Sequence, residues 1–110
     1  MCAQVAEAIL ILITAADESE AKRLATALIT DRLASCVQIL PKMESVYRWQ
    51  GRIQTESEIL LVIKTTANKF EELERTVRGL HSYDVPEILA VPVARISEPY
   101  FKWLVETLEP

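Results

Sequence analysis

The chain has 110 residues, with 12 Lys and Arg against 16 Asp and Glu, a formal net charge of -4, and two Gly. This length supports one domain, so residues 1–110 are expected to form a single unit. The negative balance argues against binding to the phosphate backbone of nucleic acids, and two Gly cannot supply a Gly-rich phosphate loop.

The hydropathy pattern and the cysteines bear on the location of the protein. The longest apolar run, at residues 8–13, is too short to cross a bilayer, and no basic segment precedes it as in a signal peptide. Cys2 and Cys36 form no CxxC pair, and with only His81 to join them a closed zinc site within one chain is excluded. We therefore expect a cytoplasmic protein with reduced thiols and no membrane partner, whose residues 1–6 are disordered.

The first part of the chain predicts a strand, a helix and a second strand. Residues 8–13 are apolar without alternation, which is typical of a strand buried on both faces. Asp17 and Glu20 form a capping box that begins a helix reaching about Ala34. A strand over residues 36–40 follows and is expected to end at the next proline.

A long hairpin is predicted over residues 43–64. Its two strands, 43–49 and 52–64, turn at Gln50-Gly51, where glycine supplies the positive φ of a two-residue turn. In that register Trp49 faces Arg52, Tyr47 faces Gln54, Ser45 faces Glu56 and Met43 faces Glu58. Because the tip is mixed in polarity, we expect the hairpin to project beyond the domain, and its alternating aromatic side chains indicate an interface.

The last part of the chain predicts a helix over residues 67–80, an edge strand within residues 87–96, and a terminal helix capped by Ser97. The terminal helix is expected to bury Tyr100, Leu104 and Leu108. The order β-α-β-β-α-β with an added helix predicts an α+β fold, the ferredoxin-like sandwich. Two helices cover only one face of such a sheet, so we expect self-association to bury the other face.

Three groups of side chains are candidates for chemistry. His81, the only histidine, is either hydrogen-bonded to a neighbour or a ligand donor. Glu56 and Glu58 share one strand face and offer, with Glu87, oxygen ligands for a divalent cation; the alternative is a solvated or ion-paired face. Cys36 is expected to be a small buried hydrophobic residue rather than a catalytic thiolate.

Four segments together resemble one known family. Residues 34–37, 45–53, 64–66 and 81–88 follow the order and spacing of the CutA divalent-cation tolerance proteins. The combination of an SxYxWxG hairpin with an HxYxxPE loop is specific, and the likeness extends from about residue 9 to residue 108.

The resemblance implies ferredoxin-like homotrimers, related in architecture to the PII signalling proteins, whose long hairpins cross between subunits. It also implies a link to tolerance of copper and other divalent metals, without enzymatic activity. By motif position, the clefts between subunits would gather Trp49, Glu58, Lys64, His81, Tyr83 and Glu87.

The sequence departs from the copper-binding members of this family at two positions. The resemblance places a cysteine on the first strand and two adjacent histidines before the tyrosine in those members. This chain has Ile13 and Leu80 there, so only His81 remains. Because copper(I) prefers thiolate and copper(II) prefers imidazole, His81 is the one candidate metal ligand of this kind, assisted by a carboxylate or by its copies in the trimer.

The primary hypothesis is therefore a non-enzymatic trimer, associated with divalent-cation tolerance, that binds copper, another divalent cation or a small ligand at its clefts. The alternative is a structural trimer that presents its hairpins to a protein partner without binding metal. A third interpretation, a small enzyme using His81, Tyr83 and Glu87, would require a closed pocket.

Overall fold

The computed structural model describes residues 6–110, so the role of Cys2 and the expectation for residues 1–6, apart from Ala6, lie outside the described residues. The elements, in chain order, are β1 (Ala8–Ala15), α1 (Glu18–Thr30), β2 (Cys36–Ile39), β3 (Met43–Trp49), β4 (Arg52–Thr66), α2 (Phe70–Leu80), β5 (Ile88–Pro92) and α3 (Glu98–Leu108). A single 3-10 turn, Ala67–Lys69, leads into α2. None of the helices within the described part of the chain is long and apolar enough to cross a membrane.

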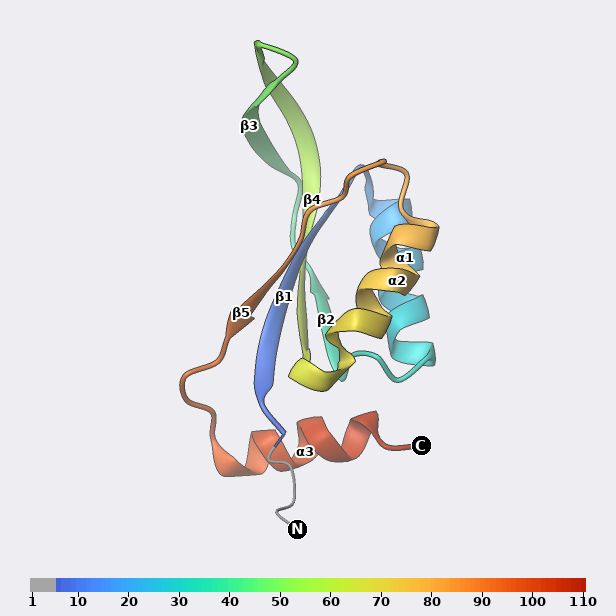
Figure 1. The fold of residues 1–110 in the computed structure, drawn as a ribbon, viewed down its shortest axis with the longest axis vertical. Coiled ribbons are helices and arrows are strands. Elements are labelled where there is room, and N and C mark those ends of the chain that lie inside the picture. Colours follow the sequence, from blue (N-terminus) through green and yellow to red (C-terminus); the bar gives the residue numbers. More distant parts are fainter. Residues whose placement is uncertain (1–5) are drawn as a thin grey trace.

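The main sheet has the strand order β2-β4-β1-β5, and each neighbouring pair is antiparallel. This is the order of a ferredoxin-like sandwich, which confirms the predicted fold class. Helices α1 and α2 lie side by side on one face of the sheet, and α3 crosses below the end at which β1 begins (Figure 1). β5 pairs only with β1 and is an edge strand, which explains how the strand accommodates Pro92.

The predicted hairpin register is confirmed. Trp49 pairs with Arg52 and Met43 with Glu58, with the intermediate pairs in between as expected. Gln50 (φ 51°) and Gly51 (φ 76°) both adopt the left-handed conformation of a type I′ turn. β4 is 15 residues long, so its second half belongs to the main sheet while its first half and β3 form a projecting arm (Figure 1).

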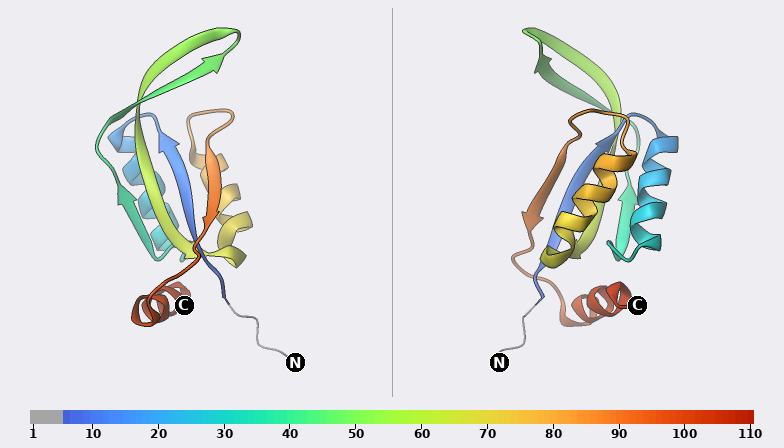
Figure 2. Two further views of the ribbon diagram at one scale, coloured as in Figure 1. Left: turned by 90° about the vertical axis from the view of Figure 1, so that its left-hand side faces the viewer. Right: turned by 45° about the vertical axis from the view of Figure 1, so that its right-hand side comes forward.

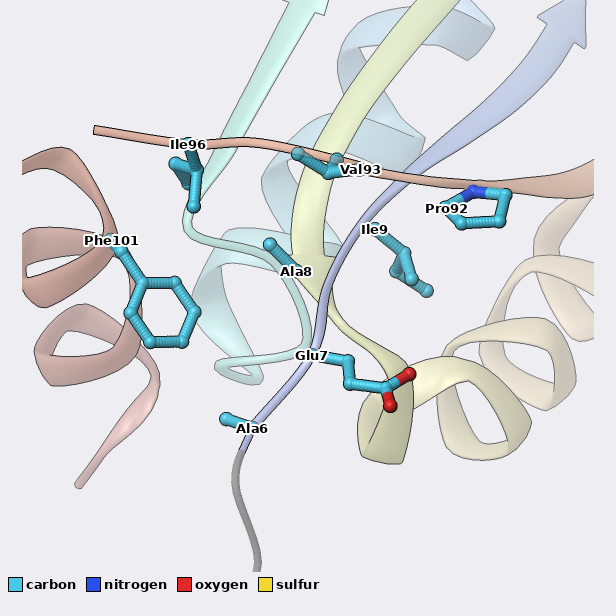
Figure 3. A pocket seen from close by; sticks show the side chains of 8 residues that line it. All are labelled: Ala6, Glu7, Ala8, Ile9, Pro92, Val93, Ile96 and Phe101. Atoms are coloured by element: carbon cyan, nitrogen blue, oxygen red, sulfur yellow. The ribbon is translucent and has the colours of Figure 1, made fainter. Parts of the chain in front are cut away.

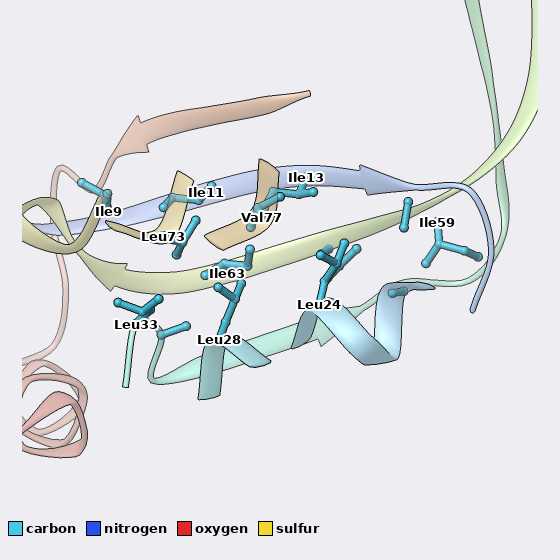
Figure 4. Packing of buried hydrophobic residues seen from close by; sticks show 14 residues of the cluster. Ile9, Ile11, Ile13, Leu24, Leu28, Leu33, Ile59, Ile63, Leu73 and Val77 are labelled. Carbon is cyan, nitrogen blue, oxygen red and sulfur yellow. The ribbon is translucent and has the colours of Figure 1, made fainter. Parts of the chain in front are cut away.

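The hydrophobic core lies between the sheet and the two helices. Ile11 and Ile13 of β1 and Leu61 of β4 are fully buried, and they pack against Leu24 of α1 and Leu73 of α2 (Figure 4). The alternation of side chains along β1 and β4 places these residues on one face. The core therefore holds β4, from which the arm extends, and α2, from which the following loop extends.

α1 ends at Thr30, earlier than the predicted Ala34. Arg32 has φ 56°, the N–H of Leu33 donates to the carbonyl of Leu28 over 2.9 Å, and that of Arg32 donates to Ile29 over 3.1 Å. These two bonds form a Schellman motif, in which the residue after the helix is left-handed. A non-glycine residue at this position hid the helix end from sequence analysis.

The terminal helix is capped as predicted, since Oγ of Ser97 accepts from the N–H of Tyr100 over 3.4 Å. Leu104 and Leu108 are buried, but the expectation for Tyr100 was wrong, because 38% of it is exposed. The helix lies across one end of the sheet rather than along its open face, so it leaves most of that face uncovered (Figure 2).

The sheet face opposite α1 and α2 remains uncovered, as predicted for a single chain (Figure 2, left). It presents aliphatic side chains from three adjacent strands, half-buried or exposed: Leu10, Leu12, Leu60, Val62, Leu89 and Val91. Such a contiguous apolar surface is typical of an interface with another protein surface.

Candidate functional site: an acidic cleft at the base of the arm

A cleft of about 800 Å³ lies between the β3–β4 arm, from its base as far as Trp49, and the loop that joins α2 to β5. Twelve residues line it. Four carry carboxylates (Glu56, Glu58, Asp84 and Glu87), three are aromatic (Tyr47, Trp49 and Tyr83), and the remaining five are uncharged. The cleft is therefore strongly acidic at neutral pH.

The opposite end of the sheet has a pocket of different character. It measures about 270 Å³ and lies between the start of β1, the segment after β5 and α3 (Figure 3). Pro92, Val93, Ile96 and Phe101 contribute apolar surface, and Glu7 is the one charged side chain among the described residues that line it. The concentration of carboxylates is thus a property of the cleft at the base of the arm.

The structure brings together four of the six side chains that the family motifs indicated, since Trp49, Glu58, Tyr83 and Glu87 all line the cleft. His81 lies directly behind it, with its ring 4.7 Å from that of Tyr83 between centroids. Lys64 does not join them within one chain. It lies six residues beyond Glu58 on β4, roughly 20 Å away along the strand, and its Nζ donates to Oε1 of Gln38.

Glu58 and Tyr83 form the inner wall of the cleft. Glu58 is only 8% exposed, and its Oε2 accepts a hydrogen bond from the hydroxyl of Tyr83 over 2.9 Å. Burial, this hydrogen bond and the charge of Glu58 raise the pKa of Tyr83 well above its ordinary value, so the phenol stays protonated as a donor. One oxygen of Glu58 is thereby occupied, and the other is left for a ligand.

The negative charge of the cleft also shifts the pKa values of two further side chains, Glu87 and Tyr47. Burial, followed by the negative charge of Glu58, raises the pKa of Glu87. Desolvation, followed by the charge and hydrogen bond of Glu56, raises the pKa of Tyr47. Both shifts have the sign expected where negative charges are held close together, and a bound cation would relieve the repulsion.

His81 holds the loop in place from inside the protein. Its side chain is fully buried, its Nε2 lies 2.7 Å from the carbonyl oxygen of Thr14, and its Nδ1 accepts from the N–H of Tyr83 over 3.0 Å. Because a carbonyl can only accept, Nε2 carries the proton and the ring is the neutral Nε2–H tautomer. The sequence left two interpretations of His81 open, a hydrogen-bonded residue or a ligand donor. In the structure both ring nitrogens make internal hydrogen bonds.

Sequence analysis missed the second residue of this buried arrangement. Glu20 is 2% exposed, and its two oxygens accept from the N–H groups of Ala16 (2.9 Å) and Ser82 (2.7 Å). Burial alone would raise the pKa of Glu20, but these bonds and the proximity of His81 hold it below its ordinary value. The sequence pattern indicates only a capping-box role for Glu20, and no sequence signal shows that its side chain reaches Ser82, 62 residues away.

We call these contacts the Glu20–His81 clasp: Glu20 and His81 with their partners Thr14, Ala16, Ser82 and Tyr83. The clasp ties the β1–α1 turn to the start of the loop, and Tyr83 ties the same loop to Glu58. The cleft wall is therefore held from both sides, which preorganises its carboxylates.

The possible metal ligands of the chain do not converge on one point. Within residues 6–110, no three His, Cys, Asp or Glu side chains are grouped closely enough to hold one ion together. Ile13, at the first-strand position where the resemblance implies a cysteine, is fully buried in the core, and Leu80 lies half exposed at the end of α2. A metal at His81 would have to replace one of its two internal hydrogen bonds.

The fold and the cleft define a ferredoxin-like α+β protein with a projecting two-stranded arm and an acidic cleft at its base. The family of CutA1 divalent ion tolerance proteins matches residues 9–107. The divalent-cation tolerance protein CutA of Thermus thermophilus is 46% identical over 96 residues, which are 87% of this chain and 93% of that protein. The chain therefore belongs to the CutA1 divalent ion tolerance protein family.

Solved structures of relatives share the whole architecture. The CutA1 protein from Thermus thermophilus matches with a TM-score of 0.89 at 44% identity, covering 91% of this chain and 97% of that one. The periplasmic divalent cation tolerance protein CutA from Archaeoglobus fulgidus matches with a TM-score of 0.90 at 36% identity, covering 93% and 99%. The chloroplastic CutA of Arabidopsis thaliana is 42% identical over 87% of this chain, which spans 53% of that longer protein.

Proposed function

We propose that the chain forms a cytoplasmic, non-enzymatic homotrimer of PII-like architecture that acts in tolerance of divalent cations, copper among them. Its acidic clefts bind a divalent cation or a small cationic ligand where subunits meet. The observation that carries this proposal is the cleft itself, in which four of twelve lining residues bear carboxylates and the other eight bear no charge.

The charge distribution favours a cationic ligand. Glu58 is nearly buried and keeps one oxygen beyond its bond to Tyr83, and Glu87 lies close enough for Glu58 to raise its pKa. Placing two carboxylates together in a partly desolvated cleft costs free energy, and a cation that neutralises them recovers it. Carboxylate oxygens suit hard divalent ions, while the imidazole of His81 suits copper(II).

His81 takes a secondary role in this proposal. Its Nδ1 faces both the N–H of Tyr83 and Oε2 of Glu20, the latter at 3.8 Å. Because coordination at Nδ1 would release the Tyr83 N–H, we assign first contact with the cation to Glu58 and Glu87, and the imidazole to a site reached only after the loop rearranges.

The open sheet face supports the trimer. Leu89 is 43% exposed and Val91 38% exposed, beside half-buried aliphatic residues of β1 and β4. Burying a face of this size in water is favourable at roughly 25 cal/mol per Å² of apolar area. Replacing Leu89 by Asp is expected to dissociate the assembly on a sizing column with light-scattering detection, whereas Ile29→Asp, at a 44%-exposed position of α1 on the other side of the sheet, should leave the mass unchanged.

The cation-binding part is tested by calorimetric titration of the metal-free protein with Cu²⁺ and Zn²⁺ at neutral pH, with the assembly mass recorded on the same sample. Saturable binding is expected, weakened by Glu58→Gln and by Glu87→Gln. Glu44→Gln removes the same charge from the other face of the arm, where Glu44 pairs with Ser57, and serves as the matched control. A trimer that takes up neither metal would contradict this part of the proposal.

The exposed arm favours one alternative, an assembly that presents its hairpins to a protein partner. Val46 is 67% exposed, Trp49 56% and Ile53 70%, so both faces of the arm carry apolar side chains in a single chain. If these residues stay exposed in the assembly, replacing Val46 and Ile53 by Thr should abolish capture of a partner without changing the mass of the assembly. If the same residues lie between subunits, the double variant should instead change that mass.

A further inference from the structure

The cleft combines acidic and aromatic side chains on a single strand surface. Tyr47 and Trp49 alternate on one face of β3, and in the observed register they lie beside Gln54 and Arg52 of β4, with Glu56 and Glu58 following on the same face. Tyr47 is 39% exposed and Trp49 56% exposed, so both rings present accessible surface. Aromatic faces attract cations, and alkyl chains pack well against them.

The negative charges are spread along the cleft. Glu56 and Glu58 are two residues apart on β4, which separates their Cα atoms by about 6.6 Å, and Glu87 enters from the loop before β5. A bare metal ion gains most from oxygens that converge on one point. Spaced carboxylates instead match a ligand whose positive charges are themselves spaced.

Glu58 provides a deep anchor at one end. It is a carboxylate that is 8% exposed, and the hydroxyl of Tyr83 occupies only one of its oxygens. The ion pair between charged side chains of the described residues joins Lys102 to Glu106, and within residues 6–110 no positively charged side chain pairs with Glu58. A buried anion without a counter-charge is costly and favours binding of a desolvated cation.

We infer that the cleft binds a linear organic diamine or oligoamine, whose first two ammonium groups pair with Glu58 and Glu56 and whose chain, in the longer amines, continues from Glu56 over Tyr47 and Trp49. This inference rests on the proposed cation-binding role of the acidic cleft and specifies its ligand class. One ammonium group donates to the free oxygen of Glu58 and to Glu87, which the charge of Glu58 already influences. The next ammonium group reaches Glu56, and beyond it the register places the rings of Tyr47 and Trp49, further towards the tip of the arm.

The test is calorimetric titration of the intact assembly with 1,4-diaminobutane, with spermidine, and with butylamine as a singly charged control. We expect affinity to rise with the charge of the amine, so that butylamine binds most weakly, diaminobutane more tightly and spermidine most tightly. Glu58→Gln should weaken the binding of diaminobutane tenfold or more, because hydrogen bonds to buried charged groups contribute strongly, about tenfold at the low end. Glu56→Gln should weaken it roughly fivefold, as for a solvent-exposed ion pair.

Two further variants separate this site from a diffuse electrostatic effect. Trp49→Leu keeps the charge but removes the ring, and is expected to weaken spermidine binding by about two- to fivefold, as for an exposed cation–π contact, while diaminobutane binding changes little. Glu44→Gln removes one negative charge on the opposite face of the arm and should change the affinity little. Light scattering on each sample shows whether the assembly is intact, and all comparisons are made at equal mass.

The outcomes distinguish this inference from the proposal on which it rests. Saturable uptake of Zn²⁺ or Cu²⁺ with no binding of diaminobutane or spermidine would overturn the amine inference and leave the cation site standing. Amine affinity that is equal for Glu58→Gln, Glu44→Gln and the unaltered protein would also overturn it. If neither metal nor amine binds, the cleft is not a cation site in the assembly, and both proposals fail together.

Discussion

The hydroxyl of Tyr83 donates a hydrogen bond to Oε2 of Glu58 over 2.9 Å, and this bond joins the loop before β5 to the base of the arm. The two residues are 25 apart in sequence and lie on segments that the core holds independently. The bond therefore sets the width of the cleft. It also fixes which oxygen of Glu58 remains available to a ligand.

Replacing Tyr83 by Phe removes this donor and keeps the ring. The 8%-exposed carboxylate of Glu58 then loses its hydrogen bond, so the free energy of unfolding should fall by about 1–2 kcal/mol. Urea denaturation of the assembly measures this change. Equal stability of Tyr83→Phe and the unaltered protein would mean that water or a neighbouring subunit replaces the phenol.

The same hydrogen bond predicts that the free energy of unfolding depends on pH in the alkaline range. The folded state raises the pKa of Tyr83 above its ordinary value of 10.0, so the unfolded chain releases its proton first. The stabilising contribution is thus fully present below pH 10.0 and is lost as the pH rises beyond it. Absorbance titration of the phenols should show one tyrosine that ionises later than the rest, and Tyr83→Phe should remove that late step.

The Glu20–His81 clasp predicts a dependence of stability on pH on the acidic side. The pKa of Glu20 lies below its ordinary value of 4.5, so its contribution is present above pH 4.5 and is lost as the pH falls through the lowered value. Glu20→Gln cannot accept from both the Ala16 and Ser82 N–H groups, because its amide nitrogen is a donor. It should cost about 1–3 kcal/mol at neutral pH.

Denaturation at a series of pH values tests the clasp. The difference in unfolding free energy between Glu20→Gln and the unaltered protein should shrink as the pH falls from 4.5 through the lowered pKa of Glu20, below which the carboxylate is protonated in both states. Glu18→Gln, at an exposed position in the first turn of the same helix, is the matched control and should show a much smaller effect. A constant difference across the acidic range would contradict the assignment of the effect to the charge of Glu20.

The parts of the fold that depend on local patterns could be predicted from the sequence. The register of the arm followed from one glycine at a two-residue turn, and the edge position of β5 followed from Pro92. The end of α1 was misplaced because Arg32, rather than glycine, adopts the left-handed conformation. In each case the outcome depended on whether the residue type revealed the backbone conformation.

Only part of the candidate site could be predicted from the sequence. Family motifs indicated Trp49, Glu58, Tyr83 and Glu87, which line one cleft. The role of Glu20 depends on a contact with Ser82 across 62 residues, and no periodicity carries that information. The burial of the His81 ring was equally hidden, because a loop position says nothing of which strand its side chain reaches.

The turn of the arm offers a stabilising substitution. Gln50 has φ 51°, a conformation that costs a non-glycine residue roughly 1 kcal/mol, and its side chain is exposed. Gln50→Gly should therefore raise the free energy of unfolding, by at most about 0.5 kcal/mol because glycine also gains entropy in the unfolded chain. Thermal denaturation compares the two proteins, and Gly51→Ala, at φ 76°, should change stability in the opposite direction.

Replacing Glu87 is expected to affect cation binding without lowering the free energy of unfolding. Burial and then the charge of Glu58 raise its pKa above 4.5, so its folded state favours the protonated carboxyl. Its contribution to stability is present below pH 4.5 and is lost as the pH rises through the raised value. Glu87→Gln should leave the ligand-free protein at neutral pH as stable as before or more stable, by no more than about 0.5 kcal/mol because water screens an exposed group.

The same substitution should weaken the binding of any cation at the cleft, because it removes one of the charges that the ligand neutralises. For the unaltered protein, cation affinity should decline as the pH falls towards 4.5, and this decline should begin above pH 4.5 because the pKa of Glu87 is raised. Calorimetric titration at several pH values measures both effects, and Glu87→Gln should flatten the profile. A variant that loses stability together with affinity would show that Glu87 supports the fold rather than the ligand.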